Sequence, residues 1–255
     1  MLTSYGRYCE QRGGKVEIKL QDDARFPDIR KALADFENQI PKALAQTITF
    51  TAERVQRDLV DAMQSAFDRP TRFTLNSVRK TTATPTKLYA QVFLKDEVSQ
   101  GTPAAKYLQP QIQGGSRRHK GVERNLRNRG FITNSQYMVP GDDAPLNTFG
   151  NLTGGQVTKA LSNIQAHWDS SQNTASPAAR KRQKRSGRQY FWMPEAGIFW
   201  RQGKSGLRSF MVVAGKPSYR KRFDFYGVSE RSAAKHLPEQ MQRSIDRVLR
   251  QSTGA

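Results

Sequence analysis

Residues 43–66, ALAQTITFTAERVQRDLVDAMQSA, decide the fold. Their apolar residues recur every three or four positions, at Leu44, Ile48, Ala52, Val55, Leu59, Met63 and Ala66. A helix with this spacing buries one face along its whole length. On the opposite side, charged pairs such as Glu53 with Arg57 each add only about 0.2–0.5 kcal/mol. Burial of the apolar face therefore stabilises this helix, and another part of the chain must cover it.

The chain before this helix is predicted to hold a short strand and a first helix. Apolar and charged residues alternate from position 16 to 20, which is typical of a half-exposed strand. Residues 1–15 are interpreted as a flexible arm. Pro27 suits the first turn of a helix, because the N–H that it lacks would have no partner there. Pro41 is predicted to interrupt that first helix.

The chain after the long helix predicts a loop and then a strand. The residue before Pro70 is pushed out of the helical region, so the helix is expected to end near residue 67. Residues 73–78 fit either a short helix capped by Thr74 or an extended piece. Residues 88–94, LYAQVFL, are rich in strand formers and place four apolar side chains on one face, which predicts a first central strand.

A basic segment follows, within GTPAAKYLQPQIQGGSRRHKGVERNLRNR at 101–129. We expect prolines and the Gly114-Gly115 pair to form turns, and Ser116 to cap a helix with a narrow apolar stripe at Val122 and Leu126. Basic residues cover the rest of that helix, which indicates an exposed surface. It is either an ordinary solvated face or a face that meets a polyanion or an acidic protein.

The strand signal is absent between residues 95 and 188. A turn is expected at 137–143, and a helix follows with apolar residues at helical spacing from Val157 to Trp168. Residues 170–188 have no apolar residue larger than alanine and hold six lysines and arginines. This tail is interpreted as a linker or as an arm that orders only on a partner.

Short segments rich in strand formers then return, separated by turn residues. They are 189–193, 197–201, 207–213 and 222–226. This spacing predicts an antiparallel meander, after which Ser229 is expected to cap a final long helix. The fold class is therefore α+β, with two long helices packed on a small antiparallel sheet. The core is assigned to residues 16–95 and 189–255, and residues 96–188 to an inserted helical and basic loop subdomain.

Composition limits the range of functions. Of 255 residues, 42 are Lys or Arg and 22 are Asp or Glu, a formal net charge of +20 that points to an anionic partner. A mean hydropathy of −0.74 suggests that neighbouring subunits complete some apolar surface. The single cysteine excludes an intrachain disulfide framework and a cysteine metal cluster. No signal peptide or membrane span is expected.

No catalytic constellation emerges from the sequence. The three histidines lie far apart, and Gly203-Lys204-Ser205 lacks the strand-to-helix context of a phosphate loop. Asp142-Asp143 is a conceivable metal or acid/base pair, but a Pro-Gly-Asp-Asp turn explains it better. The aromatic residues of the meander suit a sheet core better than a base-stacking platform. We therefore expect no catalytic, cofactor-binding or metal-binding residue.

Several segments of the chain resemble virion proteins of tailed phages and prophages. They are IPKALAQTITFTAERVQRDL, DRPTRFTLNSV, GTPAAKYLQPQIQGGSRRHKGVERNL, VPGDD with the following FGN, and FDFYGVSERSAAKHLPEQM. More remotely, these proteins are similar to the minor tail protein Z and to the tail-completion or neck proteins of long-tailed phages. The likeness to the prophage group spans most of residues 16–250.

The resemblance implies a structural protein made in the bacterial cytoplasm and built into the virion as a homo-oligomeric ring at the head–tail junction. The partners that it implies are portal or head–tail adaptor proteins, tail terminator or tail tube proteins, and the packaged DNA. The residues predicted to face a partner or DNA are Arg117, Arg118, Lys120, Arg124, Arg127, Arg180, Lys181, Arg182, Lys184 and Arg185. The alternatives are a nucleic-acid-binding module that uses these basic segments and, last, a nuclease built on Asp142 and Asp143.

Overall fold

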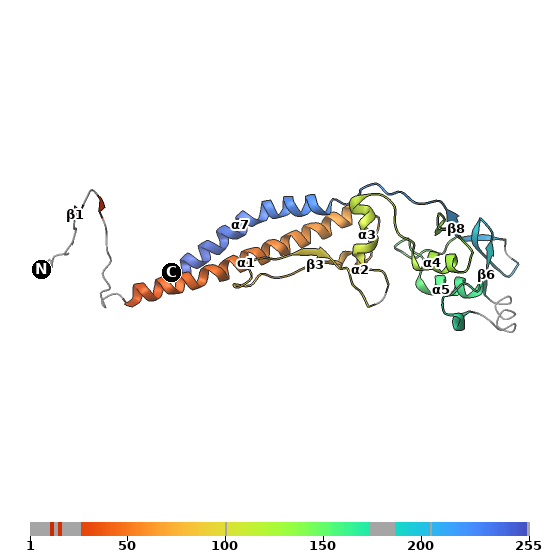
Figure 1. Ribbon diagram of the computed structural model, residues 1–255, viewed down its shortest axis with the longest axis horizontal. Coiled ribbons are helices and arrows are strands. Elements are labelled where there is room, and N and C mark those ends of the chain that lie inside the picture. Colours follow the sequence, from red (N-terminus) through yellow and green to blue (C-terminus); the bar gives the residue numbers. More distant parts are fainter. Residues whose placement is uncertain are drawn as a thin grey trace.

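The computed structural model of the protein is elongated, with a helical arm at one end and a compact domain at the other (Figure 1). It describes residues 11–12, 15–16, 27–99, 101–173, 187–204 and 206–253. We call residues 27–113 and 223–253 the helical arm, and residues 114–222 the distal domain.

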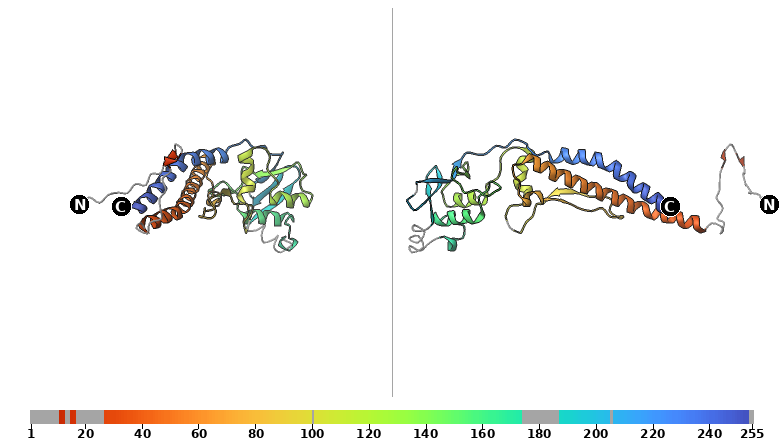
Figure 2. Two further views of the ribbon diagram at one scale, coloured as in Figure 1. Left: turned by 60° about the vertical axis from the view of Figure 1, so that its left-hand side comes forward. Right: turned by 180° about the vertical axis from the view of Figure 1, so that it is seen from behind.

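Two long helices form the helical arm. Helix α1, Pro27–Ala66, and helix α7, Phe225–Thr253, run side by side in opposite directions, as both views of Figure 2 show. The predicted interruption at Pro41 is wrong, because α1 continues through it. A proline inside a helix removes one backbone hydrogen bond, and the bonds before and after it keep the rest of the helix continuous.

The residues that join α1 to α7 are mostly small or polar. Thr47 is fully buried and donates from its hydroxyl to the hydroxyl of Ser244 at 2.8 Å. Nearer the distal domain, the Ser232 hydroxyl donates to an Asp58 carboxylate oxygen at 2.6 Å. Ala45 and Ala52 are buried apolar residues of α1 in this stretch. Small side chains let the two helices approach closely, but they bury little apolar area.

The inner half of the arm has the larger core. Helix α2, Arg72–Leu75, leads into a hairpin of β3, Val78–Lys80, and β4, Val92–Leu94, and helix α3, Ala104–Gln113, follows. The buried residues of this cluster are Val55, Leu59, Met63, Val78, Ala104, Leu108, Ile112, Phe223 and Phe225. The period of α1 thus predicted the correct face, since Val55, Leu59 and Met63 all point into this core.

Three predictions for this region need correction. Thr71 caps α2 by accepting from the N–H of Thr74, so Thr74 is not the cap. The predicted strand at 88–94 is only three residues long, because its first half turns outward and leaves Tyr89 half exposed. The expected turn around Pro110 is helix α3 instead. Pro103 at its N-cap has the fixed φ that precedes a helix, and the glycines that follow end it.

The distal domain is built on a four-stranded antiparallel sheet in the order β5-β8-β7-β6. Its strands are β5, Tyr137–Pro140; β6, Arg188–Met193; β7, Gly197–Gln202; and β8, Arg208–Ala214. Its helices are α4, Gly121–Asn128; α5, Gly154–Asn163; and the short η1, Ser170–Gln172. Side chains from the helices and all four strands form one core that includes Leu126, Leu161, Ile198 and Phe210.

The sheet differs from the predicted meander at both ends. The first strand, β5, is a segment that was predicted as a turn. The expected strand at 222–226 is instead the start of α7, and Asp224 rather than Ser229 caps this helix by accepting from the N–H of Gly227 at 3.3 Å. Phe223 and Phe225 both enter the core of the arm, and this two-residue spacing explains why the segment resembled a strand.

The α+β class and the packed pair of long helices are confirmed, with the small β3–β4 sheet against α1. The buried clusters group the later strands differently from the sequence-based partition. Strands β6, β7 and β8 share a core with α4 and α5 in the distal domain, whereas we placed them with the long helices. Strand β8 pairs with β5, and β5 lies inside the predicted insertion at 96–188. This pairing therefore places β8 and its neighbours β7 and β6 in the distal domain.

Two chain segments connect the arm to the distal domain. Gly115 and Tyr219 exchange backbone hydrogen bonds of 2.9 and 2.8 Å, which tie the outgoing segment to the returning one. Gly114 and Gly115 have φ angles of +81° and +89°, which favour glycine, so the chain can turn sharply out of α3.

Two further observations complete the fold. At the N-terminal side, β1, Gln11–Arg12, pairs with β2, Lys15–Val16. Within the described ranges, no helix has the length and apolar character needed to cross a membrane.

Candidate nucleic-acid and partner interface

Positive charge is concentrated in the distal domain. Residues 114–222 contain 20 lysines and arginines but only 5 aspartates and glutamates, a formal net charge of +15, of which +10 belongs to residues that the structure describes. The rest of the chain carries the other +5. Charge gathered at one end of an elongated molecule gives that end a strong positive potential, which attracts anionic partners.

Arg117, the first of the predicted partner-facing residues, is engaged inside the protein. Its guanidinium donates to both carboxylate oxygens of Glu123, at 2.7 and 2.5 Å, and the Glu123 side chain is fully buried. Glu123 also accepts from the backbone N–H of Lys120 at 2.6 Å and of Met138 at 2.9 Å. The buried carboxylate is thus fully hydrogen-bonded and ties the start of α4 to β5.

The Glu123 carboxyl is held in its charged form. Burial alone would raise its pKa, but the hydrogen bonds from Arg117, Met138 and Lys120 outweigh burial, so the pKa lies below its ordinary value of 4.5. Arg117 is therefore engaged within the fold, and its assignment to a partner or DNA surface stays a prediction. Its ion partner Glu123 lies in the same charged run, and sequence alone does not show which residue of such a run is buried.

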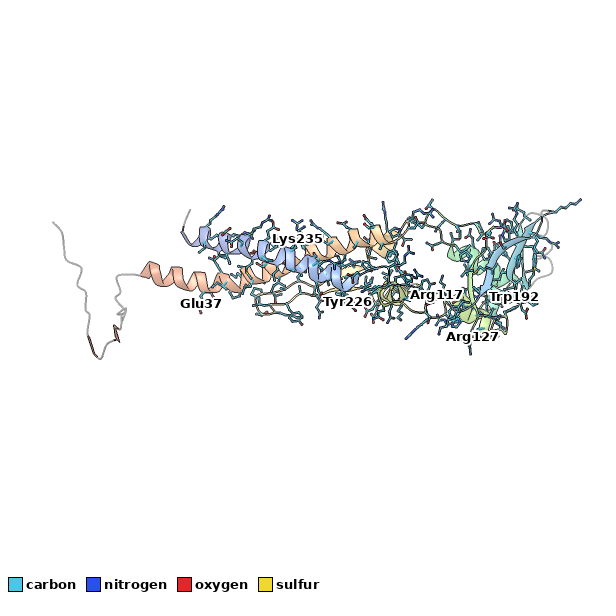
Figure 3. The ribbon with its side chains drawn as sticks, turned by 90° about the horizontal axis from the view of Figure 1, so that it is seen from above. Glu37, Arg117, Arg127, Trp192, Tyr226 and Lys235 are labelled. Atoms are coloured by element: carbon cyan, nitrogen blue, oxygen red, sulfur yellow. The ribbon has the colours of Figure 1, made fainter. Side chains whose placement is uncertain are left out.

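The rest of the predicted basic segment divides between internal and exposed residues. Arg127 is partly buried and donates to the Asn134 side-chain oxygen at 3.3 Å. Arg129 donates to the carbonyl of His167 at 3.3 Å. The predicted residues that do lie on the surface are Arg118, Lys120 and Arg124. In Figure 3, Arg117 lies toward the arm, and Arg127 lies in the distal domain with Trp192.

The second predicted group, Arg180, Lys181, Arg182, Lys184 and Arg185, lies outside the described residues. Its assignment to a partner or DNA surface stays a prediction.

The structure assembles a basic group that the sequence reading did not single out. The guanidinium of Arg188 lies 4.4 Å from the centre of the Trp200 ring, and that of Arg208 lies 5.2 Å from it. Arg188 comes from β6 and Arg208 from β8, so the two approach the indole from the strands on either side of β7. The alternation of side chains along each strand could have indicated the face on which each residue lies. Only the register between the strands places Arg188, Trp200 and Arg208 together.

Trp200 is itself buried, with 3% of its surface exposed. Within the described ranges, its indole N–H is a buried donor with no hydrogen-bond acceptor. Burial raises the pKa of the nearby Tyr190 hydroxyl, and the Arg188 guanidinium opposes the rise. Both arginines are thus positioned by aromatic neighbours at the edge of the core.

The helical arm exposes several large apolar side chains among its charged ones. Ile40 on α1 is 41% exposed, and Leu237 and Ile245 on α7 are 41% and 45% exposed. A shallow groove between the outer ends of the two helices is lined by Ile40, Ala43, Leu44, Met241, Ser244, Ile245, Val248 and Leu249. Of these residues, Val248 is buried, whereas Ile40, Ile245 and Leu249 are more than 40% exposed.

The alternative sites considered from the sequence have structural roles. Asp143 accepts from the backbone N–H and hydroxyl of Ser209, at 3.0 and 3.3 Å, which fits the turn interpretation. The aromatic residues Tyr190, Trp200 and Phe210 are core residues, as expected. In the part of the chain that the structure describes, no three His, Cys, Asp or Glu side chains gather as a metal site would require.

Comparison with known proteins finds no matching protein-family model, no matching curated protein and no matching solved structure.

Proposed function

We propose that this chain is a structural protein of a tailed-phage virion, a tail-completion or neck component that forms a homo-oligomeric ring at the head–tail junction. In this role it performs no catalysis. Its proposed neighbours are portal or head–tail adaptor proteins on one side and tail terminator or tail tube proteins on the other. The sequence resemblance described above supplies the class of protein.

The observation that carries the assembly role is the apolar groove at the outer end of the helical arm. Large side chains on both helices are 40% or more exposed there, as for Ile40 and Ile245. An apolar surface shared by two packed helices is typical of helices that pack against further helices. A second copy of the chain presents the same kind of surface, so arms that pack side by side bury it.

The test compares two double variants by sedimentation velocity over a range of protein concentrations. Ile40→Ser with Ile245→Ser makes the arm groove polar, and Val139→Ser with Leu146→Ser changes two similarly exposed apolar residues of the distal domain. We expect the wild type and the distal variant to assemble and the arm variant to stay monomeric. A wild type that stays monomeric, or an arm variant that assembles normally, would refute the role of the arm.

A further inference from the structure

We propose that the end of the distal sheet where Arg188, Trp200 and Arg208 lie on β6, β7 and β8 binds the phosphate backbone of duplex DNA. This goes beyond the assembly role, because it concerns the other end of the molecule. It is argued from charge, from the packing of the two arginines and from the burial of the aromatic residues.

The charge of this region matches a polyanion better than a mixed protein surface. The described residues of the distal domain carry a net charge of +10, and its acidic residue Glu123 is paired with Arg117 inside the fold. Around the proposed site, Arg201 and Lys204 are also exposed. Phosphates repeat regularly along a nucleic acid, so a surface with many cations and few anions gains from each contact.

The two arginines are positioned before a ligand arrives. A guanidinium stacked on an indole loses less conformational freedom on binding than one on a free side chain, and its planar fork matches phosphate oxygens. The Arg188 guanidinium lies 4.4 Å from the centre of the Trp200 ring. Arg208 extends from the adjoining strand and is exposed.

Burial of the aromatic residues favours duplex over single-stranded nucleic acid. Proteins that hold single strands stack the bases on exposed aromatic rings. Here Trp200 is 3% exposed and Tyr190 is 4% exposed, so neither ring offers a stacking surface. The contacts that the site can make are with phosphates, which a duplex presents on its outside. Binding of this kind is independent of base sequence and strongly dependent on salt.

The experiment measures the affinity of the full-length protein for a short fluorescent duplex of mixed sequence at several salt concentrations. The test variant is Arg188→Gln with Arg208→Gln. Arg54→Gln with Arg57→Gln on α1 removes the same charge from exposed positions of the arm. Loss of two phosphate contacts should flatten the slope of log affinity against log salt by about 2 and weaken binding roughly 10- to 100-fold at about 0.1 M salt. The arm variant should bind almost as the wild type does.

A second variant separates binding from folding. Arg201→Gln with Lys204→Gln changes exposed neighbours that have no ring contact, and we expect a several-fold loss of affinity with an unchanged melting temperature. Unchanged affinity and salt slope in a folded Arg188/Arg208 variant would overturn the proposal. So would a wild type that prefers poly-glutamate to the duplex, since this would indicate an acidic protein partner. Assembly is measured with the arm variants, and DNA binding is measured with the distal variants. One proposal can therefore fail while the other holds.

Discussion

The two ends of this molecule differ in what they leave exposed. The outer half of the helical arm packs α1 on α7 largely through small and polar residues such as Thr47 and Ser244, and it leaves larger apolar side chains such as Ile245 on its surface. The distal domain has a complete core around Phe210 and leaves basic side chains on its surface. An apolar surface favours packing with other proteins, whereas a basic surface favours anions. The difference suggests that one end assembles and the other meets DNA.

The largest expected effect tests whether Arg117 belongs to the fold or to the basic surface. Arg117→Ala leaves the buried Glu123 carboxylate without its ion partner, which should cost about 3–5 kcal/mol of unfolding free energy. Arg118→Ala, at the exposed neighbouring position, should change the unfolding free energy by less than about 0.5 kcal/mol. Urea unfolding measures both. Equal effects would contradict the division between internal and surface arginines.

A second pair of variants compares the inner and outer surfaces of the arm. Leu59 on α1 is fully buried, and Leu237 on α7 is 41% exposed. Leu59→Ala should destabilise the monomer by about 2–5 kcal/mol because it leaves a cavity. Leu237→Ala should cost the monomer less than about 1 kcal/mol, since the side chain already contacts water. Thermal unfolding at low protein concentration is the measurement, and a similar loss in both variants would show that Leu237 belongs to the monomer core.

The smallest expected effect concerns pH. Since the pKa of Glu123 is lowered in the folded protein, the charged carboxylate stabilises the fold above its ordinary pKa of 4.5. This contribution is lost as the pH falls from that value toward the lowered pKa. Glu123→Gln removes the titrating group, so the stability difference between wild type and variant should shrink on acidification. Urea unfolding from about pH 6 to about pH 3 would show it. A constant difference would mean that Glu123 does not stabilise the fold through its charge.

The sequence predicted the elements whose pattern is local. The three- and four-residue spacing in α1 located both the helix and its buried face, and turn residues marked the limits of β6, β7 and β8. The sequence did not predict β5, which is four residues long and pairs with β8 about 70 residues later. No local pattern records that pairing, and the partition into domains depends on it.

The candidate site could be predicted only as a region. A net charge of +20 indicated an anionic partner, and the runs of basic residues indicated a part of the chain that could contact it. The separation of Arg117 from Arg118 depends on which side of the chain faces Glu123, and the meeting of Arg188 with Arg208 depends on strand register. Tertiary packing sets both arrangements. A count of charged residues therefore does not distinguish a buried arginine from a surface arginine.

The most direct test of the central claim is a cryo-electron reconstruction of the virion head–tail junction, with the position of the protein confirmed by cross-linking mass spectrometry. We predict a closed ring in which neighbouring copies contact each other through the α1–α7 arms and the distal domains face the DNA. Absence of the protein from mature particles would contradict the account. A ring whose copies meet through the distal domains, with the arm groove open to solvent, would contradict it as well.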